Sequence, residues 1–313
     1  MKRFILRRLS FMLITLLASS ILIFIATQIL PGDVARMVLG RFATEEALAN
    51  LREQLGLNRP LIEQYFSWLV NFIQGDWGMS LSSSTPVMEL VFGRLRNSAM
   101  LAGVAFVMYV PAGILLGLIA ALRKNRFVDH LISVVSLAFI GLPEFVTGVI
   151  LIAIFAIKLR WFPASSAIDP EASFMEALPR LILPAVTVCM VSLAYITRMT
   201  RSSTLGVLSM DFVRTAYLKG LKPYQVLFGH VLRNALLPTV TVVAIGIGWL
   251  IGGLIVTESL FSFPGLGRLL LFAIQRQDLP LIQATTLLLV CIFSVSNLVA
   301  DILYAWLNPR IRY

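Results

Sequence analysis

Residues 98–122 read SAMLAGVAFVMYVPAGILLGLIAAL, and this stretch contains no charged side chain. A helix of about 20 apolar residues is long enough to cross the hydrocarbon core of a bilayer. Runs of similar length recur along the chain of 313 residues, of which 58% are hydrophobic and only 13% are charged. The sequence therefore predicts an all-α membrane protein.

Six such runs are present, and we expect each of them to form a transmembrane helix. The first run is too long for the core of a cleavable signal peptide, and no Ala-x-Ala site follows it, so we interpret it as an uncleaved span. The expected spans are residues 9–30, 98–122, 131–157, 181–200, 236–257 and 282–306.

The basic residues predict the orientation of these spans. Cytoplasmic loops carry an excess of Lys and Arg when short loops are compared. The short loops on the side opposite the N-terminus hold only Lys158, Arg160, Arg180, Arg268 and Arg276. The remaining basic residues of the termini and short loops fall on the N-terminal side, so both termini are predicted to be cytoplasmic. The net charge of +10 is thus explained by topology, and nucleic acid is not expected as a partner.

Three parts of the chain are expected from this pattern. Residues 1–30 form the cytoplasmic N-terminus and the first span, and residues 98–313 form a core of five spans. Residues 31–97 form a small helical segment outside the membrane, in which Thr44 can cap one helix and Pro60 can open another. This segment either packs the first span against the second or serves as a docking surface. A further short helix is expected after Gly267.

Residues 211–238, DFVRTAYLKGLKPYQVLFGHVLRNALLP, form a basic insert between the fourth and fifth spans. Gly220 can adopt a positive φ and end a first short helix, and Pro223 suits the first turn of a second helix. In the second helix an apolar face is expected from helical spacing, and it comprises Tyr224, Leu227, Phe228, Val231 and Leu232. This amphipathic helix–turn–helix either lies on lipid headgroups or docks into a partner protein.

Few residues inside the spans are ionisable or otherwise suited to catalysis or ligand binding. The sequence lacks a G-x-x-x-x-G-K-[ST] phosphate loop and a metal or catalytic constellation, so we expect a protein that is not an enzyme. Glu144, beside Pro143 in the third span, either lines a polar pathway or serves as a structural partner. Gly248 and Gly252 form a G-x-x-x-G pair that favours close helix packing, and they are further candidates for the pathway lining.

The insert resembles the EAA loop of ABC-importer membrane subunits, in its peptide and nickel variant. Arg214, Thr215 and Ala216 stand in place of Glu-Ala-Ala, and Gly220 keeps its spacing. The loop residues carried over are Arg214, Thr215, Ala216, Lys219, Gly220, Tyr224, Phe228 and Arg233, within a loop of residues 201–235. The segments LPGD (30–33), QLGLNRPLIEQY (54–65), QGDWGMS (74–80), ESLFSFPGLGRLL (258–270) and DILYAWLNPRIRY (301–313) resemble the first permease subunit of dipeptide, oligopeptide and nickel importers.

The resemblance implies a set of partners in a bacterial or archaeal cytoplasmic membrane. A homologous second permease would complete the pathway, two ATPase subunits would grip the loops and hold ATP and Mg²⁺, and an extracytoplasmic binding protein would deliver a peptide or similar solute. A self-contained secondary transporter or channel is the alternative, although such proteins often contain inverted repeats and several intramembrane charges. A membrane-anchored scaffold is a third possibility. No cofactor is expected in this chain itself.

Overall fold

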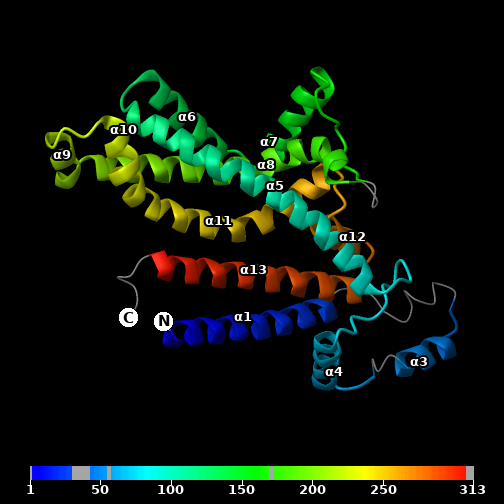
Figure 1. Cartoon of the computed structure of the whole chain (residues 1–313). Coiled ribbons are helices and arrows are strands. Elements are labelled where there is room, and N and C mark those ends of the chain that lie inside the picture. The colour runs from blue at the N-terminus through cyan, green and yellow to red at the C-terminus, as the bar shows by residue number, and fades with distance from the viewer. Residues whose placement is uncertain (1, 30–42, 55–57, 169–172, 308–313) are drawn as a thin grey trace. The chain divides into compact units, whose positions relative to one another are not determined.

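The computed structural model describes residues 2–29, 43–54, 58–168 and 173–307, and its named elements are all helical (Figure 1). Five helices are long and apolar enough to cross a membrane, and a bent pair of helices provides a sixth span if it is counted as one. These long helices confirm the predicted fold class. The motif at residues 30–33 and the last residues of the chain lie outside the described residues.

The long helices arise from uninterrupted apolar sequence. They are α1 (Lys2–Ile29), α5 (Val87–Leu122), α8 (Phe174–Leu208), α11 (Leu232–Leu260) and α13 (Leu279–Leu307). Helix α5 has 36 residues. At 1.5 Å per residue it is about 54 Å long, well beyond the hydrocarbon thickness of about 30 Å. The second span therefore extends upstream of the predicted start at residue 98, because no strong helix breaker lies between Val87 and that residue.

The third span is bent, which differs from the single run expected at residues 131–157. It consists of α6 (Phe127–Gly141) and α7 (Glu144–Leu151), which meet at 112°, followed by the π-helical segment η1 (Ile152–Lys158). Leu142 is extended, with a ψ of 132°. Proline disfavours helical geometry at the residue before it and lacks an N–H, so Pro143 breaks the hydrogen-bond ladder at this point. Glu144 consequently begins a new helix.

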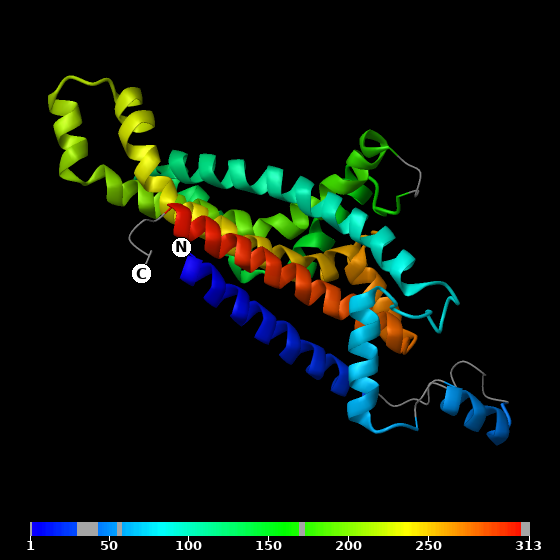
Figure 2. The same cartoon turned by 60° about the horizontal axis from the view of Figure 1, so that its bottom comes forward.

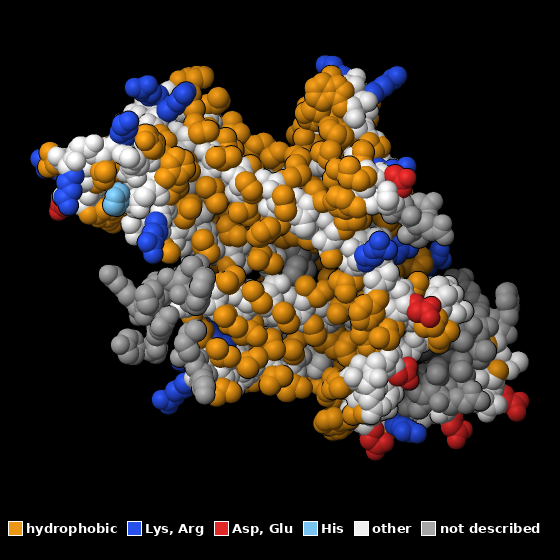
Figure 3. All heavy atoms as spheres, viewed as in Figure 1, with side chains coloured by type: hydrophobic (Ala, Val, Ile, Leu, Met, Phe, Trp, Pro, Cys, Tyr) orange, Lys and Arg blue, Asp and Glu red, His pale blue; other side chains and the backbone are white. Residues whose placement is uncertain are grey.

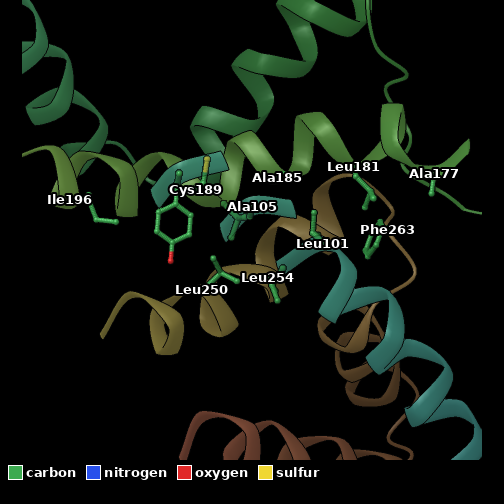
Figure 4. Packing of buried hydrophobic residues seen from close by; sticks show 12 residues of the cluster. Leu101, Ala105, Ala177, Leu181, Ala185, Cys189, Ile196, Leu250, Leu254 and Phe263 are labelled. Atoms are coloured by element: carbon green, nitrogen blue, oxygen red, sulfur yellow. The ribbon is translucent and has the colours of Figure 1, made fainter. Parts of the chain in front are cut away.

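Residues 99–263, together with the chain's two end segments, form one compact unit. Its core is a layer of small and medium-sized apolar side chains (Figure 4). The core residues labelled in that view are Leu101, Ala105, Ala177, Leu181, Ala185, Cys189, Ile196, Leu250, Leu254 and Phe263. Helices α5 and α8 approach closely, since a Cβ added at Gly117 would lie 2.6 Å from the backbone oxygen of Thr197. Small residues thus allow the helix backbones to pack without a hydrophobic driving force.

Residues 9–98 and 264–294 form the other compact unit. Besides parts of α1, α5 and α13, it contains α3 (Glu45–Gln54), α4 (Leu61–Gln74) and α12 (Leu266–Gln275). The predicted cap of α3 is confirmed, because the hydroxyl oxygen of Thr44 accepts a hydrogen bond from the Ala47 amide at 3.3 Å. Helix α12 confirms the short helix expected after Gly267, although it begins two residues earlier, at Leu266.

A buried carboxylate orders the loop that precedes α5 in this second unit. Asp278 accepts hydrogen bonds from the Ser80 hydroxyl at 2.5 Å and from the Ser82 hydroxyl at 2.7 Å. It also accepts one from the Ser82 amide at 3.0 Å. The aromatic ring of Trp77 stacks on that of Phe72, with centroids 4.8 Å apart. Because several polar and aromatic contacts converge here, the loop has a defined conformation although it contains little regular structure.

Candidate functional site

The insert between α8 and α11 forms a helical hairpin. It consists of α9 (Asp211–Leu218), α10 (Pro223–Val226) and the π-helical turn η2 (Leu227–Val231), which continues into α11. Figure 2 shows this hairpin at the end of the unit where α8 ends and α11 begins. Lys and Arg side chains are visible over the same end in the space-filling view (Figure 3). The predicted helix–turn–helix is therefore present.

The turn of the hairpin is set by Gly220, whose φ is +80°. The Gly220 amide donates to the Tyr217 carbonyl at 2.9 Å, and the Leu221 amide donates to the Ala216 carbonyl at 3.3 Å. This pair of bonds is a Schellman motif, in which a residue with positive φ satisfies the last carbonyls of a helix. Pro223 occupies the first turn of α10, as expected. Both turn predictions are confirmed, and the angle between the two helices follows from this local chemistry.

The buried side of the hairpin differs from the predicted apolar face. The side chains packed together are small and aliphatic, namely Val207, Val213, Ala216, Val226, Val231 and Ala235. Of the predicted face only Val231 is fully buried, whereas Tyr224 and Phe228 are 57% and 69% exposed. Val226 and Val231 are five residues apart, which is the spacing of a π-helical hydrogen bond, and η2 brings both of them to the buried side. Tyr224 and Phe228 of the predicted apolar face therefore remain exposed on the hairpin, as contact with lipid headgroups or with a partner protein requires.

The outer side of the hairpin combines aromatic and basic residues. All of the predicted coupling-loop residues except Ala216 are exposed, namely Arg214, Thr215, Lys219, Gly220, Tyr224, Phe228 and Arg233. Leu218 is 80% exposed beside them. Aromatic residues and Arg are enriched in protein interfaces, and large exposed side chains grouped on one surface indicate a contact site. This arrangement suits a protein partner better than it suits an isolated loop in water.

Glu144 lies at the bend of the third span, where it is the first residue of α7. Its carboxylate accepts a hydrogen bond from the Thr257 hydroxyl of α11, and Thr257 itself is fully buried. A Cβ added at Gly253 would lie 2.7 Å from Glu144 Oε2, so this glycine gives the carboxylate room. The side chain is only partly buried. Glu144 therefore connects α7 to α11 and keeps part of its surface accessible.

The glycine pair of α11 is divided between two environments. Gly248 is buried, whereas Gly252 is exposed, and nothing lies within 4 Å of a Cβ added at Gly252. The close helix approach expected from the G-x-x-x-G pair is made in this chain by Gly253, which packs against Glu144 and Val188. The pathway role of Gly248 and Gly252 stays a prediction. It concerns a surface that we expect another subunit to complete.

One pair of charged residues was missed by the sequence interpretation. Asp129, at the start of α6, is only 1% exposed, and it forms an ion pair with Arg201 of α8. The available signal was a single acid among Arg123, Lys124 and Arg126 at the edge of a span. Sequence spacing does not reveal the pairing, because the two residues belong to different helices.

Comparison with known proteins places these features in a family. Residues 113–313 match the family described as "Binding-protein-dependent transport system inner membrane component", and residues 1–102 match its N-terminal companion. The hairpin and Glu144 both lie inside the first match. The chain belongs to this family. It is therefore a non-catalytic permease subunit of a binding-protein-dependent ABC importer in the inner membrane, as the sequence motifs implied.

Two relatives match over essentially the full chain. The probable peptide ABC transporter permease protein y4tP of Sinorhizobium fredii is 39% identical over 310 residues, which cover 99% of both chains. The glutathione transport system permease protein GsiC of Escherichia coli is 38% identical over 313 residues, which cover 100% of both chains. Membership of the family implies a partner permease, an ATPase and a substrate-binding protein.

Proposed function

We infer that the protein forms the translocation pathway for peptides or peptide-like solutes together with a homologous second permease. One of the two relatives is named a peptide permease and the other a glutathione permease, and glutathione is itself a small peptide. The bilayer part of the proposed pathway includes Glu144, Gly248 and Gly252. An ionisable residue inside a membrane protein faces a polar cavity or another subunit, because contact with lipid is costly.

The coupling of ATP hydrolysis to transport is assigned to residues 211–238. Two cytoplasmic ATPase subunits would hold this hairpin in each of the two permeases, with Tyr224 and Phe228 as apolar anchors and Arg214, Lys219 and Arg233 around them. The observation that carries this proposal is the ordered hairpin itself. Its turn is fixed by Gly220, its inner side is packed, and its outer side exposes large aromatic residues. A rigid lever of this kind transmits movement from a partner to the membrane helices.

The proposed topology follows from the basic residues. Both termini and the loop at residues 201–235 are assigned to the cytoplasm, and residues 31–97 are assigned to the outside, where the binding protein delivers its solute. The boundaries at residues 1–30, 31–97 and 98–313 are part of this proposal. The boundaries rest on the apolar runs at residues 9–30 and 98–122, and the assignment of sides rests on the distribution of Lys and Arg over the short loops.

Reconstitution tests this function. The chain is purified with its second permease and ATPase subunits and placed in proteoliposomes, and uptake of labelled glutathione and labelled dialanine is measured with and without ATP. We expect uptake of at least one of these probes only when ATP and the cognate binding protein are both present. The chain alone is expected to show no ATPase activity, since its sequence contains no phosphate loop. Uptake by the isolated chain that follows an ion gradient would favour a secondary transporter and contradict the proposal.

A further inference from the structure

The ion pair between α6 and α8 consists of two parallel hydrogen bonds. Arg201 Nε donates to Asp129 Oδ1 at 2.5 Å, and Arg201 Nη2 donates to Asp129 Oδ2 at 2.8 Å. The side chain of Asp129 is 1% exposed and that of Arg201 is 30% exposed. Two parallel bonds from the planar guanidinium define both the distance and the relative orientation of the groups. The two helices are therefore held at one angle at this point.

Asp129 also holds the turn between α5 and α6. Its Oδ2 accepts a hydrogen bond from the Asn125 amide at 2.9 Å. Asn125 has a φ of +61°, a conformation that L-residues adopt rarely and that Asn tolerates better than most residues. One carboxylate thus connects the turn, the first turn of α6 and α8. Removal of the carboxylate would release all three segments together.

Next to Arg201, helix α8 packs tightly against two other helices, α11 and α5. The Thr200 hydroxyl lies 3.1 Å from the Thr239 hydroxyl of α11, and both residues are fully buried. A Cβ added at Gly117 of α5 would lie 2.6 Å from Thr200 Cβ. Beyond this level Val207 of α8 packs with Val213 of α9 in the core of the hairpin. A displacement of the hairpin is therefore passed directly to the part of α8 that carries Arg201.

We propose that the Asp129–Arg201 pair transmits the movement of the hairpin to the third span, so that both are positioning residues for ATP-driven transport. The inference rests on the proposed coupling function of the hairpin. Helix α6 leads through the bend into α7, whose first residue is Glu144. Movement of α8 thus reaches the carboxylate at the bend through Arg201 and Asp129. A contact between two helices transmits movement in this way only if it has discrete arrangements and does not slide.

An ion pair suits this role better than apolar packing does. The attraction between apolar side chains is non-directional, so it does not by itself define the relative orientation of two helices. Separation of a buried ion pair leaves an uncompensated charge, so intermediate positions are strongly disfavoured. The bond between α6 and α8 is therefore either formed or absent, and α6 follows α8 as a rigid body while it is formed.

The test compares two neutral double variants of the assembled transporter. Asp129→Asn with Arg201→Gln removes both charges and nearly preserves side-chain volume, so no unpaired charge is left inside the protein. The matched control is Arg8→Gln with Asp301→Asn, because Arg8 and Asp301 form a more exposed ion pair in the same unit at 3.1 Å. Spin labels are placed at Leu131 of α6 and at Met210 just before α9, which are 50% and 49% exposed. Cys189 and Cys291 are first replaced by Ala.

The distance between the two labels is measured in the nucleotide-free complex and in the complex trapped with ATP and vanadate. In the unaltered protein and the control we expect the same narrow distance in both states. In the Asp129→Asn, Arg201→Gln variant we expect the distance to change on trapping, and ATP hydrolysis stimulated by the binding protein to fall by roughly tenfold, a typical loss of coupling between sites. A variant that keeps the distance, with hydrolysis within about twofold of the unaltered protein, overturns the inference.

Two further results are also decisive. If the neutral variant does not assemble, Arg201→Lys provides the same comparison, because it keeps the charge and loses the two-pronged bond. A Lys variant that behaves like the unaltered complex then contradicts the inference. Failure of the proposed function is distinguishable, since the unaltered chain would then not co-purify with ATPase subunits at all.

Discussion

At the scale of single residues, the carboxylate of Glu144 is hydrogen-bonded on one side, while part of the side chain remains accessible. The Thr257 hydroxyl donates a hydrogen bond to its carboxylate, and Gly253 leaves space beside it. The donor is a side chain of α11, which the sequence interpretation did not identify as a partner of Glu144. The carboxylate thereby ties α7 to α11.

Replacement of Glu144 by Gln separates charge from hydrogen bonding. The Gln side chain still accepts a bond from Thr257, so we expect normal assembly with the partner subunits. Loss of the charge from the pathway is expected to lower uptake by about tenfold, which corresponds to 1.4 kcal/mol in the barrier. Uptake into proteoliposomes and co-purification of the ATPase subunits are measured together.

The matched change is Thr257→Val, which keeps the charge and removes the donor. We expect it to reduce stability by about 1–3 kcal/mol, because a partly buried acceptor loses its partner. Thermal denaturation of the detergent-solubilised complex measures this loss. If Glu144→Gln abolishes assembly, the carboxylate has a structural role and not a role in the pathway.

At the scale of elements, the hairpin depends on one backbone conformation. A branched residue at Gly220 must adopt the φ of +80°, which costs about 1–3 kcal/mol. Space does not limit the substitution, since nothing lies within 4 Å of an added Cβ. We expect Gly220→Val to insert normally into the membrane but to retain less ATPase subunit and to lose uptake. Gly220→Ala should have a milder effect. Quantitative immunoblots of co-purified ATPase provide the measurement, and full retention in the Val variant would indicate a loop that only contacts headgroups.

The sequence predicted those elements whose signals are local. Gly220 and Pro223 define the hairpin turn, and Thr44 caps its helix, because each acts on backbone within a few residues. The bend at Pro143 was not predicted as a bend, since many proline residues are tolerated inside membrane helices, as Pro111 is in α5. The Asp129–Arg201 pair joins two helices distant in sequence, so no local pattern predicts it. Helical periodicity did not separate the members of the predicted face that are buried within this chain, such as Val231, from Tyr224 and Phe228, which stay exposed.

At the scale of the whole molecule, the orientation in the membrane decides whether the other proposals are possible. The hairpin can meet cytoplasmic ATPase subunits only if the N-terminal side faces the cytoplasm. The four basic residues of the hairpin and the cluster of Arg123, Lys124 and Arg126 together contribute seven of the basic residues assigned to the N-terminal side. Translocation of such segments across the membrane is disfavoured, which gives the orientation its physical basis.

Accessibility of single cysteines tests this orientation. In a variant with Cys189 and Cys291 replaced by Ala, one cysteine is introduced in turn at Gln74, Ser165 or Lys222, all of which are exposed. We expect a membrane-impermeant maleimide to label the first two positions in intact spheroplasts and to label position 222 only after permeabilisation. Ser165 is chosen over its neighbour Ser166, because Ser166 is fully buried and its amide donates to the Phe261 carbonyl at 2.8 Å. Labelling of position 222 from outside would reverse the topology. The exposed aromatic residues of the hairpin would then face the binding protein's side of the membrane, and the coupling role would have to be abandoned.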